Sequence, residues 1–362
     1  MNLHKNKDYN ATVESLSPFG IGQLTLEGKQ ILIPNVIPGE DVLFKLIKID
    51  SKKGIGKYLH LITGSPYRVD PPCSIATRCG GCQLQHMNIE RQLQHKESLI
   101  SAQLPKDTSV EIVPTETPLY YRNKLQLSFE YSKYGFQLGL YKTHSNQVID
   151  TQSCKIAHPT INKVLYAIRA WITDLNEDTP LAHLVIRHSS LNEIMVGLIV
   201  SSTDFKERDS FVSALNQIPS VKSILLNINQ SPNETVLGET TEILFGSEKI
   251  SDSCLDINYP VSLNTFVQTN PSMTELMYKH VGELVKSTAP NLAWDLYCGI
   301  GVLTQFLARF SKQTVGVDFI EESISNAKQA SEENKCENAT FIAQDVRDFV
   351  SSNDQNPDLV IL

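Results

Sequence analysis

The first sixty residues consist of short apolar runs broken by glycine and proline. Between Ala11 and about Leu61 the runs 30–33 and 42–49 are separated by turn signals such as Pro38-Gly39. Strands of this length and spacing are typical of a small antiparallel β-barrel. Barrels of the oligonucleotide-binding type commonly hold single-stranded nucleic acid on a basic face. The lysines that would supply this charge are Lys45, Lys48, Lys52, Lys53 and Lys57. A solvated strand edge that discourages pairing is the alternative.

The central part of the chain mixes helical and strand patterns. A loop-rich stretch follows Ser65-Pro66, and a helical pattern then runs from about Asn88 to Gln103. The region of about 110–255 contains strand-like apolar runs at 124–130 and 193–200. We find no internal repeat and no low-complexity tract. This pattern predicts a central α+β domain over 65–255.

The last hundred residues have the pattern of an α/β domain. A helical pattern at 272–287 precedes four apolar runs, which are separated by helical lengths and lie at 292–297, 314–319, 340–345 and 358–362. Buried strands alternating with helices predict a doubly wound parallel sheet. We therefore expect a multidomain α+β and α/β protein with a barrel over 1–64, a central domain over 65–255 and a Rossmann-like domain over 256–362.

Composition describes a soluble globular chain. The chain has 362 residues, of which 41% are hydrophobic and 20% charged, a composition that excludes disorder of the chain as a whole. No apolar run approaches the roughly 20 residues that a membrane span needs, and the first residues have no signal-peptide core. We therefore expect a cytoplasmic protein without a membrane partner. Seven cysteines make a disulfide framework improbable there and favour metal binding or chemistry.

Charge is distributed unevenly along the chain. Residues 1–160 hold 18 Lys and Arg against 14 Asp and Glu, whereas residues 161–362 hold 14 against 26. Asymmetry of this kind is a recognised hint of nucleic-acid contact. The positive excess is modest, however, and a plain solvated surface explains it as well. Charge alone therefore does not decide the function.

Three of the cysteines are clustered. Cys73, Cys79 and Cys82 lie in a glycine-rich loop, and Cys154 follows far downstream. Four such thiolates suit a cuboidal iron–sulfur cluster, which the spacing favours. Structural zinc and unliganded thiols remain open, because zinc usually takes two close ligand pairs. His86 keeps zinc in consideration, although a packed or surface histidine is the simpler interpretation.

A second motif, Asp295-Leu-Tyr297-Cys-Gly299-Ile-Gly301, follows an apolar strand and precedes a helical run. Glycines at such a turn let a cofactor approach the backbone and the helix N-terminus. Asp318 ends the next strand at the spacing that suits ribose hydroxyls, and Asp345 follows the third strand, where it could meet an adenine amino group. The third glycine of the dinucleotide fingerprint is missing. These residues therefore favour S-adenosylmethionine over NAD.

With these motifs the sequence resembles a known family, the iron–sulfur branch of the RNA uracil-C5 methyltransferases, which make 5-methyluridine. The resemblance covers essentially the whole chain. It is carried by stretches 34–40, 79–86, 121–124, 266–270 and 295–301. The first of these stretches lies in a barrel that resembles a TRAM domain, which is an RNA-binding module in the family. The resemblance favours 23S ribosomal RNA over transfer RNA as the substrate.

The resemblance also implies roles for individual residues. It implies a [4Fe-4S] cluster on Cys73, Cys79, Cys82 and Cys154. It places S-adenosylmethionine against Gln268, Tyr297, Gly299, Gly301, Asp318 and Asp345; most relatives have Glu in place of Asp318. Arg122 and Lys124 would contact RNA phosphates. Phe266 would stack on a flipped-out base, although a core phenylalanine is the alternative. We expect structural roles for Tyr121, Cys254, Cys298 and Cys336.

The family's reaction needs a cysteine that adds to uracil C6 and a glutamate that removes the C5 proton. In the family both follow an Asp-Pro-Pro-Arg motif after the fourth strand, and this chain ends on that strand at Leu362. We therefore expect no catalytic residue in the chain, a truncated methyltransferase domain and no methyl transfer by residues 1–362 alone. The alternatives are a noncatalytic RNA-binding or assembly factor with a structural cluster and a radical enzyme. A monomer is the default expectation.

Overall fold

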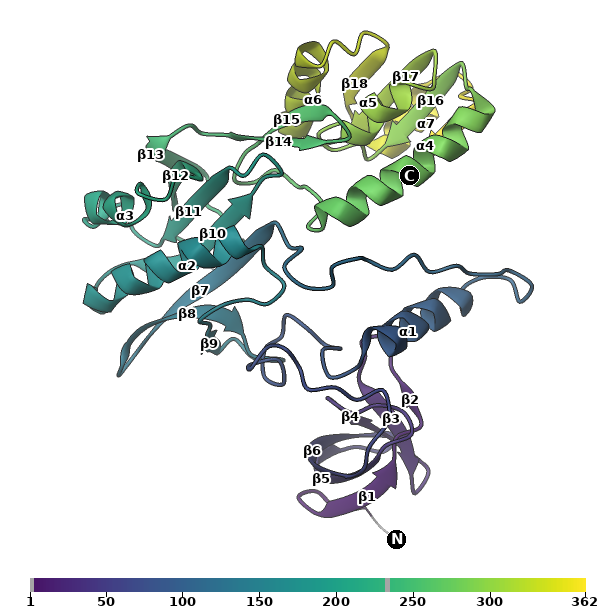
Figure 1. Cartoon of the computed structure of the whole chain (residues 1–362), viewed down its shortest axis with the longest axis vertical. Coiled ribbons are helices and arrows are strands. Elements are labelled where there is room, and N and C mark those ends of the chain that lie inside the picture. The colour runs from purple at the N-terminus through teal and green to yellow at the C-terminus, as the bar shows by residue number, and fades with distance from the viewer. Residues whose placement is uncertain (1–2, 232–234) are drawn as a thin grey trace. The chain divides into compact units, whose positions relative to one another are not determined.

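The computed structural model describes residues 3–231 and 235–362 (Figure 1). The chain divides into two compact units. The first unit is Met1–Pro118 with Leu140–Thr151, and the second is Leu119–Gly139 with Gln152–Leu362. The three-domain division expected from the sequence stays a prediction, because positions 64 and 255 are not borders between these two units.

The first unit begins with a six-stranded barrel of order β1-β5-β6-β4-β3-β2. Its strands are β1 (Asp8–Thr12), β2 (Ser15–Leu16), β3 (Gly22–Leu26), β4 (Lys29–Ile33), β5 (Asp41–Ile49) and β6 (Lys53–Thr63). Alternate residues of these strands are buried and form the barrel core; they include Leu24, Ile31, Val42 and Phe44. One pair, β4 with β6, is parallel, so the expectation of a purely antiparallel barrel was wrong at that pair. The helix α1 (Ile89–Ser101) follows.

A buried ion pair joins the barrel to the loop after it. Glu40 is fully buried, and its carboxylate accepts hydrogen bonds from Arg68 Nε at 2.5 Å and from Arg68 Nη2 at 2.6 Å. Arg68 Nη2 also donates to Asn35 O at 3.0 Å. Because a buried charge needs a partner, this pair fixes the exit of the chain from the barrel.

A seven-stranded sheet follows, with the order β13-β12-β11-β10-β7-β8-β9. Its strands are β7 (Lys124–Ser132), β8 (Gly135–Tyr141), β9 (Val148–Asp150), β10 (Leu181–His188), β11 (Ile194–Val200), β12 (Val221–Ile228) and β13 (Thr240–Gly246). Helices α2 (Pro159–Trp171) and α3 (Arg208–Leu215) and the 3-10 turn η1 (Ile172–Asp174) accompany them. Every residue of β11 is buried, as expected for a central strand with both faces covered.

The hairpin of β14 (Ile250–Cys254) and β15 (Ile257–Val261) leads into helix α4 (Pro271–Thr288) and a parallel sheet of order β18-β17-β16-β19. The sheet consists of β16 (Leu292–Leu296), β17 (Gln313–Asp318), β18 (Ala339–Ala343) and β19 (Leu359–Ile361). Helices α5 (Val302–Ala308), α6 (Glu321–Glu333) and α7 (Val346–Ser352) alternate with the strands. The four strands and the helix predicted from the sequence here are confirmed.

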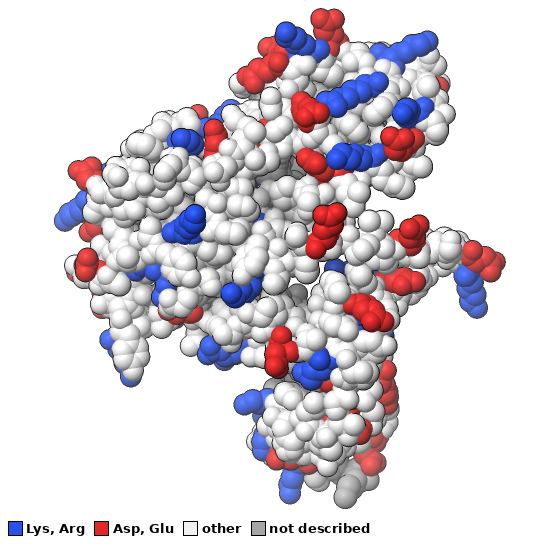
Figure 2. Space-filling view, in the orientation of Figure 1, with Lys and Arg blue, Asp and Glu red and all other residues white. Residues whose placement is uncertain are grey.

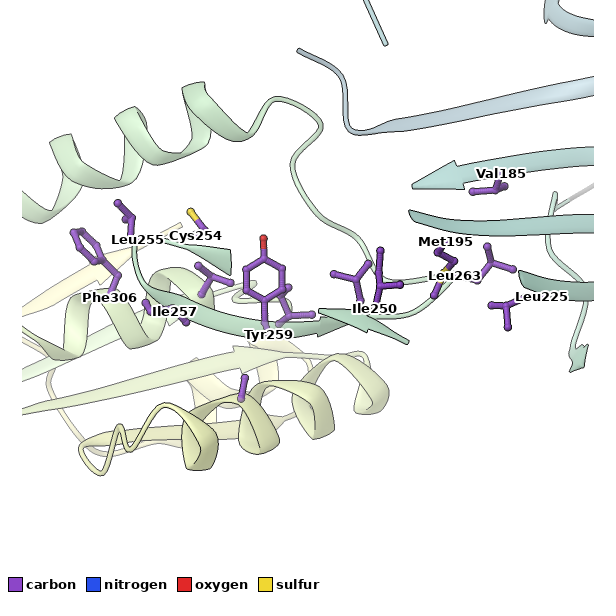
Figure 3. Close-up of a cluster of buried hydrophobic side chains, with 14 of the residues drawn as sticks. Val185, Met195, Leu225, Ile250, Cys254, Leu255, Ile257, Tyr259, Leu263 and Phe306 are labelled. Atoms are coloured by element: carbon purple, nitrogen blue, oxygen red, sulfur yellow. The ribbon is translucent and has the colours of Figure 1, made fainter. Parts of the chain in front are cut away.

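One apolar cluster connects the elements of the second unit (Figure 3). It runs from Val185, Met195 and Leu225 on the seven-stranded sheet to Tyr259 on β15 and Phe306 on α5. Full burial of each large apolar side chain is worth about 1.5–3 kcal/mol. The cluster therefore holds the hairpin and the parallel sheet against the seven-stranded sheet.

No helix in the described ranges has the length and apolarity that a membrane crossing requires. On the face drawn in Figure 2, acidic and basic side chains are scattered among each other over a surface that consists mostly of other residues. The positive excess of the first 160 residues therefore does not form a broad basic patch on that face.

Candidate functional site

The turn between β16 and α5 has an unusual backbone. Tyr297, Gly299 and Gly301 all have positive φ, of 66°, 55° and 72°. A Cβ on Gly301 would lie 2.4 Å from a ring carbon of Phe341, whereas a Cβ on Gly299 would meet nothing within 4 Å. Gly301 is therefore required by packing, and Gly299 leaves an open strip of backbone. A ligand can approach the chain closely at Gly299.

Asp318 ends β17 beside this turn and is 7% exposed. Its Oδ2 accepts a hydrogen bond from Gly299 N at 3.0 Å, and its Oδ1 accepts from Ile320 N at 3.0 Å. A carboxylate has about four lone-pair positions, so two remain for a ligand. The structure thus places Asp318 and the glycine turn together, as their spacing predicts.

Phe319 is a surface feature that the sequence argument missed. Its side chain is 67% exposed directly after Asp318, and the neighbouring Ile320 is 44% exposed. An apolar ring beside a carboxylate at a strand end suits a ligand with a planar ring and hydroxyl groups. An apolar pair directly after the strand-ending aspartate was the signal that could have identified it.

Asp345 has a visible structural role. It lies two residues beyond β18 and caps α7, with Oδ1 accepting from Arg347 N at 2.8 Å and from Asp348 N at 3.4 Å. Its second oxygen is not used in the cap. The adenine contact expected of Asp345 therefore stays a prediction.

Phe266 and Gln268 lie on the loop between β15 and α4. Together with Tyr297 and Gly299 they line a cavity of about 150 Å³. Phe266 is 74% exposed, so the alternative interpretation of a core phenylalanine is wrong. The wall of the cavity also includes Asn123, Cys254, Tyr259, Glu275, Tyr278 and Cys298. The structure thus gathers four of the predicted site residues around one cavity and leaves Asp318 at its edge, bonded to Gly299.

Neither cysteine of the cavity wall is suited to nucleophilic attack. Burial, with smaller contributions from nearby carboxylates, raises the pKa of Cys254 to about 12 and also raises the pKa of Cys298. Since the thiolate is the reactive form, both thiols are inert at neutral pH. Among the described residues that line the cavity we therefore assign no cysteine nucleophile.

Three cations lie close together at the start of β7. Arg122 Nε donates to Lys124 O at 3.0 Å. Burial, with smaller contributions from the positive charges of Arg187 and Arg122, lowers the pKa of Lys124 to about 8. An anion placed here would relieve the repulsion between like charges. This arrangement suits the phosphate contacts predicted for Arg122 and Lys124, which remain untested.

Of the four cysteines of the predicted cluster, Cys73 and Cys154 are free thiols. In the first unit the Cys79 sulfur accepts a hydrogen bond from Gly81 N at 3.4 Å. In the second unit Asn162 fixes Cys154, because its Oδ1 accepts from Cys154 N at 2.8 Å and its Nδ2 donates to Cys154 O at 3.1 Å. Within 3–231 and 235–362 no group of three His, Cys, Asp or Glu side chains is placed to hold a metal ion. The donor chemistry fits a cluster, but the ligand set is not confirmed. His86 is 4% exposed and packs with its Nε2 3.4 Å from Val36 O.

Comparison with known proteins gives three findings. A model described as a methyltransferase domain matches residues 293–362. The chain is 33% identical to an uncharacterized RNA methyltransferase of Halalkalibacterium halodurans over 95% of this chain and 78% of that protein, and 31% identical to another from Clostridium tetani over 94% and 77%. A solved tRNA (uracil-54, C5)-methyltransferase of Pyrococcus abyssi, in complex with S-adenosyl-L-homocysteine, aligns with a TM-score of 0.77 at 23% identity, covering 98% of this chain and 83% of that one.

Proposed function

The chain belongs to the RNA methyltransferase family of these relatives, and we propose that it serves the S-adenosylmethionine-dependent methylation of uridine C5 in RNA. The observation that carries the proposal is the cavity shared by Phe266, Gln268, Tyr297 and Gly299. It combines an exposed aromatic ring with an open glycine turn, to which Asp318 is hydrogen-bonded. The methyltransferase of Pyrococcus abyssi, whose fold is similar, supports uracil C5 as the target atom.

We assign the cofactor to the glycine turn. Asp318 would accept hydrogen bonds from the ribose hydroxyls, and Asp345 would meet the adenine amino group. The open backbone at Gly299 and the side chains of Tyr297 and Gln268 would hold the methionine end. Bound there, S-adenosylmethionine supplies an electrophilic methyl group.

We assign the RNA to Phe266, Arg122 and Lys124. Chemistry on a ring carbon requires the base to leave its stack, and an exposed aromatic ring such as Phe266 can receive it. Arg122 and Lys124 would hold phosphates and orient the strand. Base attack and proton removal are not assigned to any residue of this chain. We propose 23S ribosomal RNA as the substrate because the barrel and the cysteine motif resemble the ribosomal branch.

We also propose that Cys73, Cys79, Cys82 and Cys154 hold a [4Fe-4S] cluster. The Gly81 N–H directed at the Cys79 sulfur and the hydrogen bonds between Asn162 and the Cys154 backbone support this. The test is anaerobic purification with iron and sulfide analysis. Cys79→Ser and Cys154→Ser should lose iron, whereas the matched variant Cys336→Ser should keep it. Zinc in place of iron, or iron retained in both ligand variants, would refute the cluster.

The test of the function uses the full-length natural protein with unmodified 23S ribosomal RNA and transfer RNA transcripts and labelled S-adenosylmethionine. We expect 5-methyluridine in the ribosomal RNA, identified by nucleoside mass spectrometry. Asp318→Ala should weaken cofactor binding by about tenfold or more, whereas the exposed substitution Asp354→Ala should not. Label on another nucleoside contradicts uracil C5. RNA binding without methyl transfer favours the noncatalytic RNA-binding factor.

A further inference from the structure

The loop 262–270, which carries Phe266 and Gln268, is held at both ends by hydrogen bonds from residues in or directly before strands of the seven-stranded sheet. At its beginning lies Arg187, a residue of β10 that is only 3% exposed. Its guanidinium donates to Leu263 O from Nη2 at 3.0 Å and from Nε at 3.3 Å, and Nη2 also donates to Thr265 O. One rigid fork thus spans two carbonyls of the loop.

At the other end of the loop lies Asn123, which is 5% exposed. Its backbone N donates to Thr269 O at 3.1 Å, and its Nδ2 donates to Gln268 O at 3.1 Å. Asn123 is itself fixed, because its carbonyl accepts from His188 N on β10 at 2.8 Å. The two carbonyl groups that directly follow the Gln268 side chain are therefore held by one residue.

The loop is also tied to the parallel sheet. Both oxygens of Glu322 on α6 accept from it, Oε1 from Ser262 Oγ at 3.1 Å and Oε2 from Asn264 Nδ2 at 2.7 Å. The loop that carries Phe266 and Gln268 is thus held by Arg187 on β10, by Asn123 directly before β7 and by Glu322 on α6. A loop fastened in this way presents its side chains in one orientation, which ligand binding then need not impose.

Holding the loop with Asn123 and Arg187 has an energetic cost, which argues that these two residues do more than pack in the core. Asn123 Oδ1 is buried and has no hydrogen-bond partner among the described residues. Leaving such an acceptor unsatisfied costs roughly 1–3 kcal/mol. Burying the charged Arg187 also costs free energy, since burial lowers its pKa to about 10 and only the negative charge of Asp252 opposes this. Apolar side chains could pack against the loop without burying a charge or an unsatisfied polar atom. Fixing the positions of the loop's carbonyl groups, however, requires hydrogen-bond donors.

We propose that Asn123 and Arg187 are positioning residues that orient Gln268 and Phe266 for the cofactor and the base. The inference rests on the proposed function of Gln268 as a cofactor contact. Because Asn123 lies between Arg122 and Lys124, the same strand start that is assigned to RNA phosphates also fixes the cofactor loop.

The test is a double-mutant cycle in the full-length natural protein, with S-adenosylhomocysteine affinity measured by calorimetry. Asn123→Ala and Gln268→Ala should each weaken binding by about tenfold. If Asn123 acts through Gln268, the double variant should bind S-adenosylhomocysteine only about ten- to twentyfold more weakly than the natural protein, not about a hundredfold more weakly. The matched control is Asn227→Ala. Asn227 is 1% exposed and donates to Gly238 O and Thr240 O, away from the cavity. Its removal should leave affinity unchanged.

Arg187 gives an independent arm of the test. Arg187→Lys keeps the charge but loses the fork, so binding should weaken almost as much as in Arg187→Met. Affinity that survives in Arg187→Lys would overturn the positioning role of the fork. Additive effects of Asn123→Ala and Gln268→Ala would overturn the role of Asn123. If Gln268→Ala alone has no effect, the cofactor assignment fails instead, so the two failures are distinguishable.

Discussion

The substitution Asp295→Asn tests the electrostatics beneath the glycine turn. Asp295 is 4% exposed, and Thr304 Oγ1 donates to its Oδ2 at 2.5 Å. Burial raises the pKa of Asp295 to about 6, although the hydrogen bonds from Thr304 oppose this, and the charge of Asp318 adds a smaller increase. The carboxyl group is therefore held in a site that favours its neutral form.

The size and sign of the effect follow from linkage between protonation and folding. The pKa rises from 3.8 in the unfolded chain to about 6 in the folded protein. At 1.36 kcal/mol for each pKa unit, this corresponds to about 3 kcal/mol at most. Between these two values the folded state binds the proton more tightly. The stability contributed by Asp295 is therefore present below about pH 4 and is lost as the pH rises through about 6.

Asn at this position does not titrate and can still accept the Thr304 hydrogen bond. We therefore expect Asp295→Asn to gain stability relative to the natural protein as the pH rises from 4 to 8, by up to about 3 kcal/mol. Urea unfolding at several pH values measures this difference. Glu283→Gln, an exposed change on α4, should show no such trend. The reasoning would be refuted if the difference in unfolding free energy between the Asp295→Asn variant and the natural protein stayed constant with pH.

Three further substitutions test other parts of the structure. Gly301→Ala places a methyl group against Phe341 at positive φ and should lower unfolding free energy by roughly 2 kcal/mol or more, measured by denaturant titration. Arg68→Met leaves the buried Glu40 carboxylate unpaired and should cost about 3–5 kcal/mol, most of which Glu40→Gln should restore in the double variant. Lys124→Met should weaken RNA binding and reduce the slope of log K against log[salt] by about one unit. Because the pKa of Lys124 is about 8, RNA binding by the natural protein should weaken as the pH rises past 8.

Strong local patterns made much of the second unit predictable. Each strand of the parallel sheet is a short apolar run between helical lengths, and this is the pattern that burial on both faces demands. The pairing of β4 with β6 was not predictable, because parallel pairing depends on where the chain returns after β5. Local patterns contain no such long-range information.

The candidate site was predictable where its chemistry depends on local spacing. Gly299 and Asp318 end neighbouring parallel strands, so their meeting follows from sheet topology. The cap made by Asp345 was recognisable only once the start of α7 was known. The roles of Asn123 and Arg187 could not be predicted, since the partner of Asn123 lies 145 positions away in the chain and those of Arg187 lie 76 and 78 positions away.

The distribution of charge fits the two ligands of the proposed function. The acidic second half of the chain places Asp295 and Asp318 beneath and beside the glycine turn, where carboxylates favour the sulfonium of S-adenosylmethionine. The same carboxylates repel RNA phosphates. Arg122 and Lys124 at the start of β7, with Arg187 next to them, provide positive charge on the side of the cavity formed by Asn123. Because like charges raise the energy of this cation group, a phosphate bound there would lower it. The proposed RNA contact would therefore gain most at these residues, with the base at Phe266.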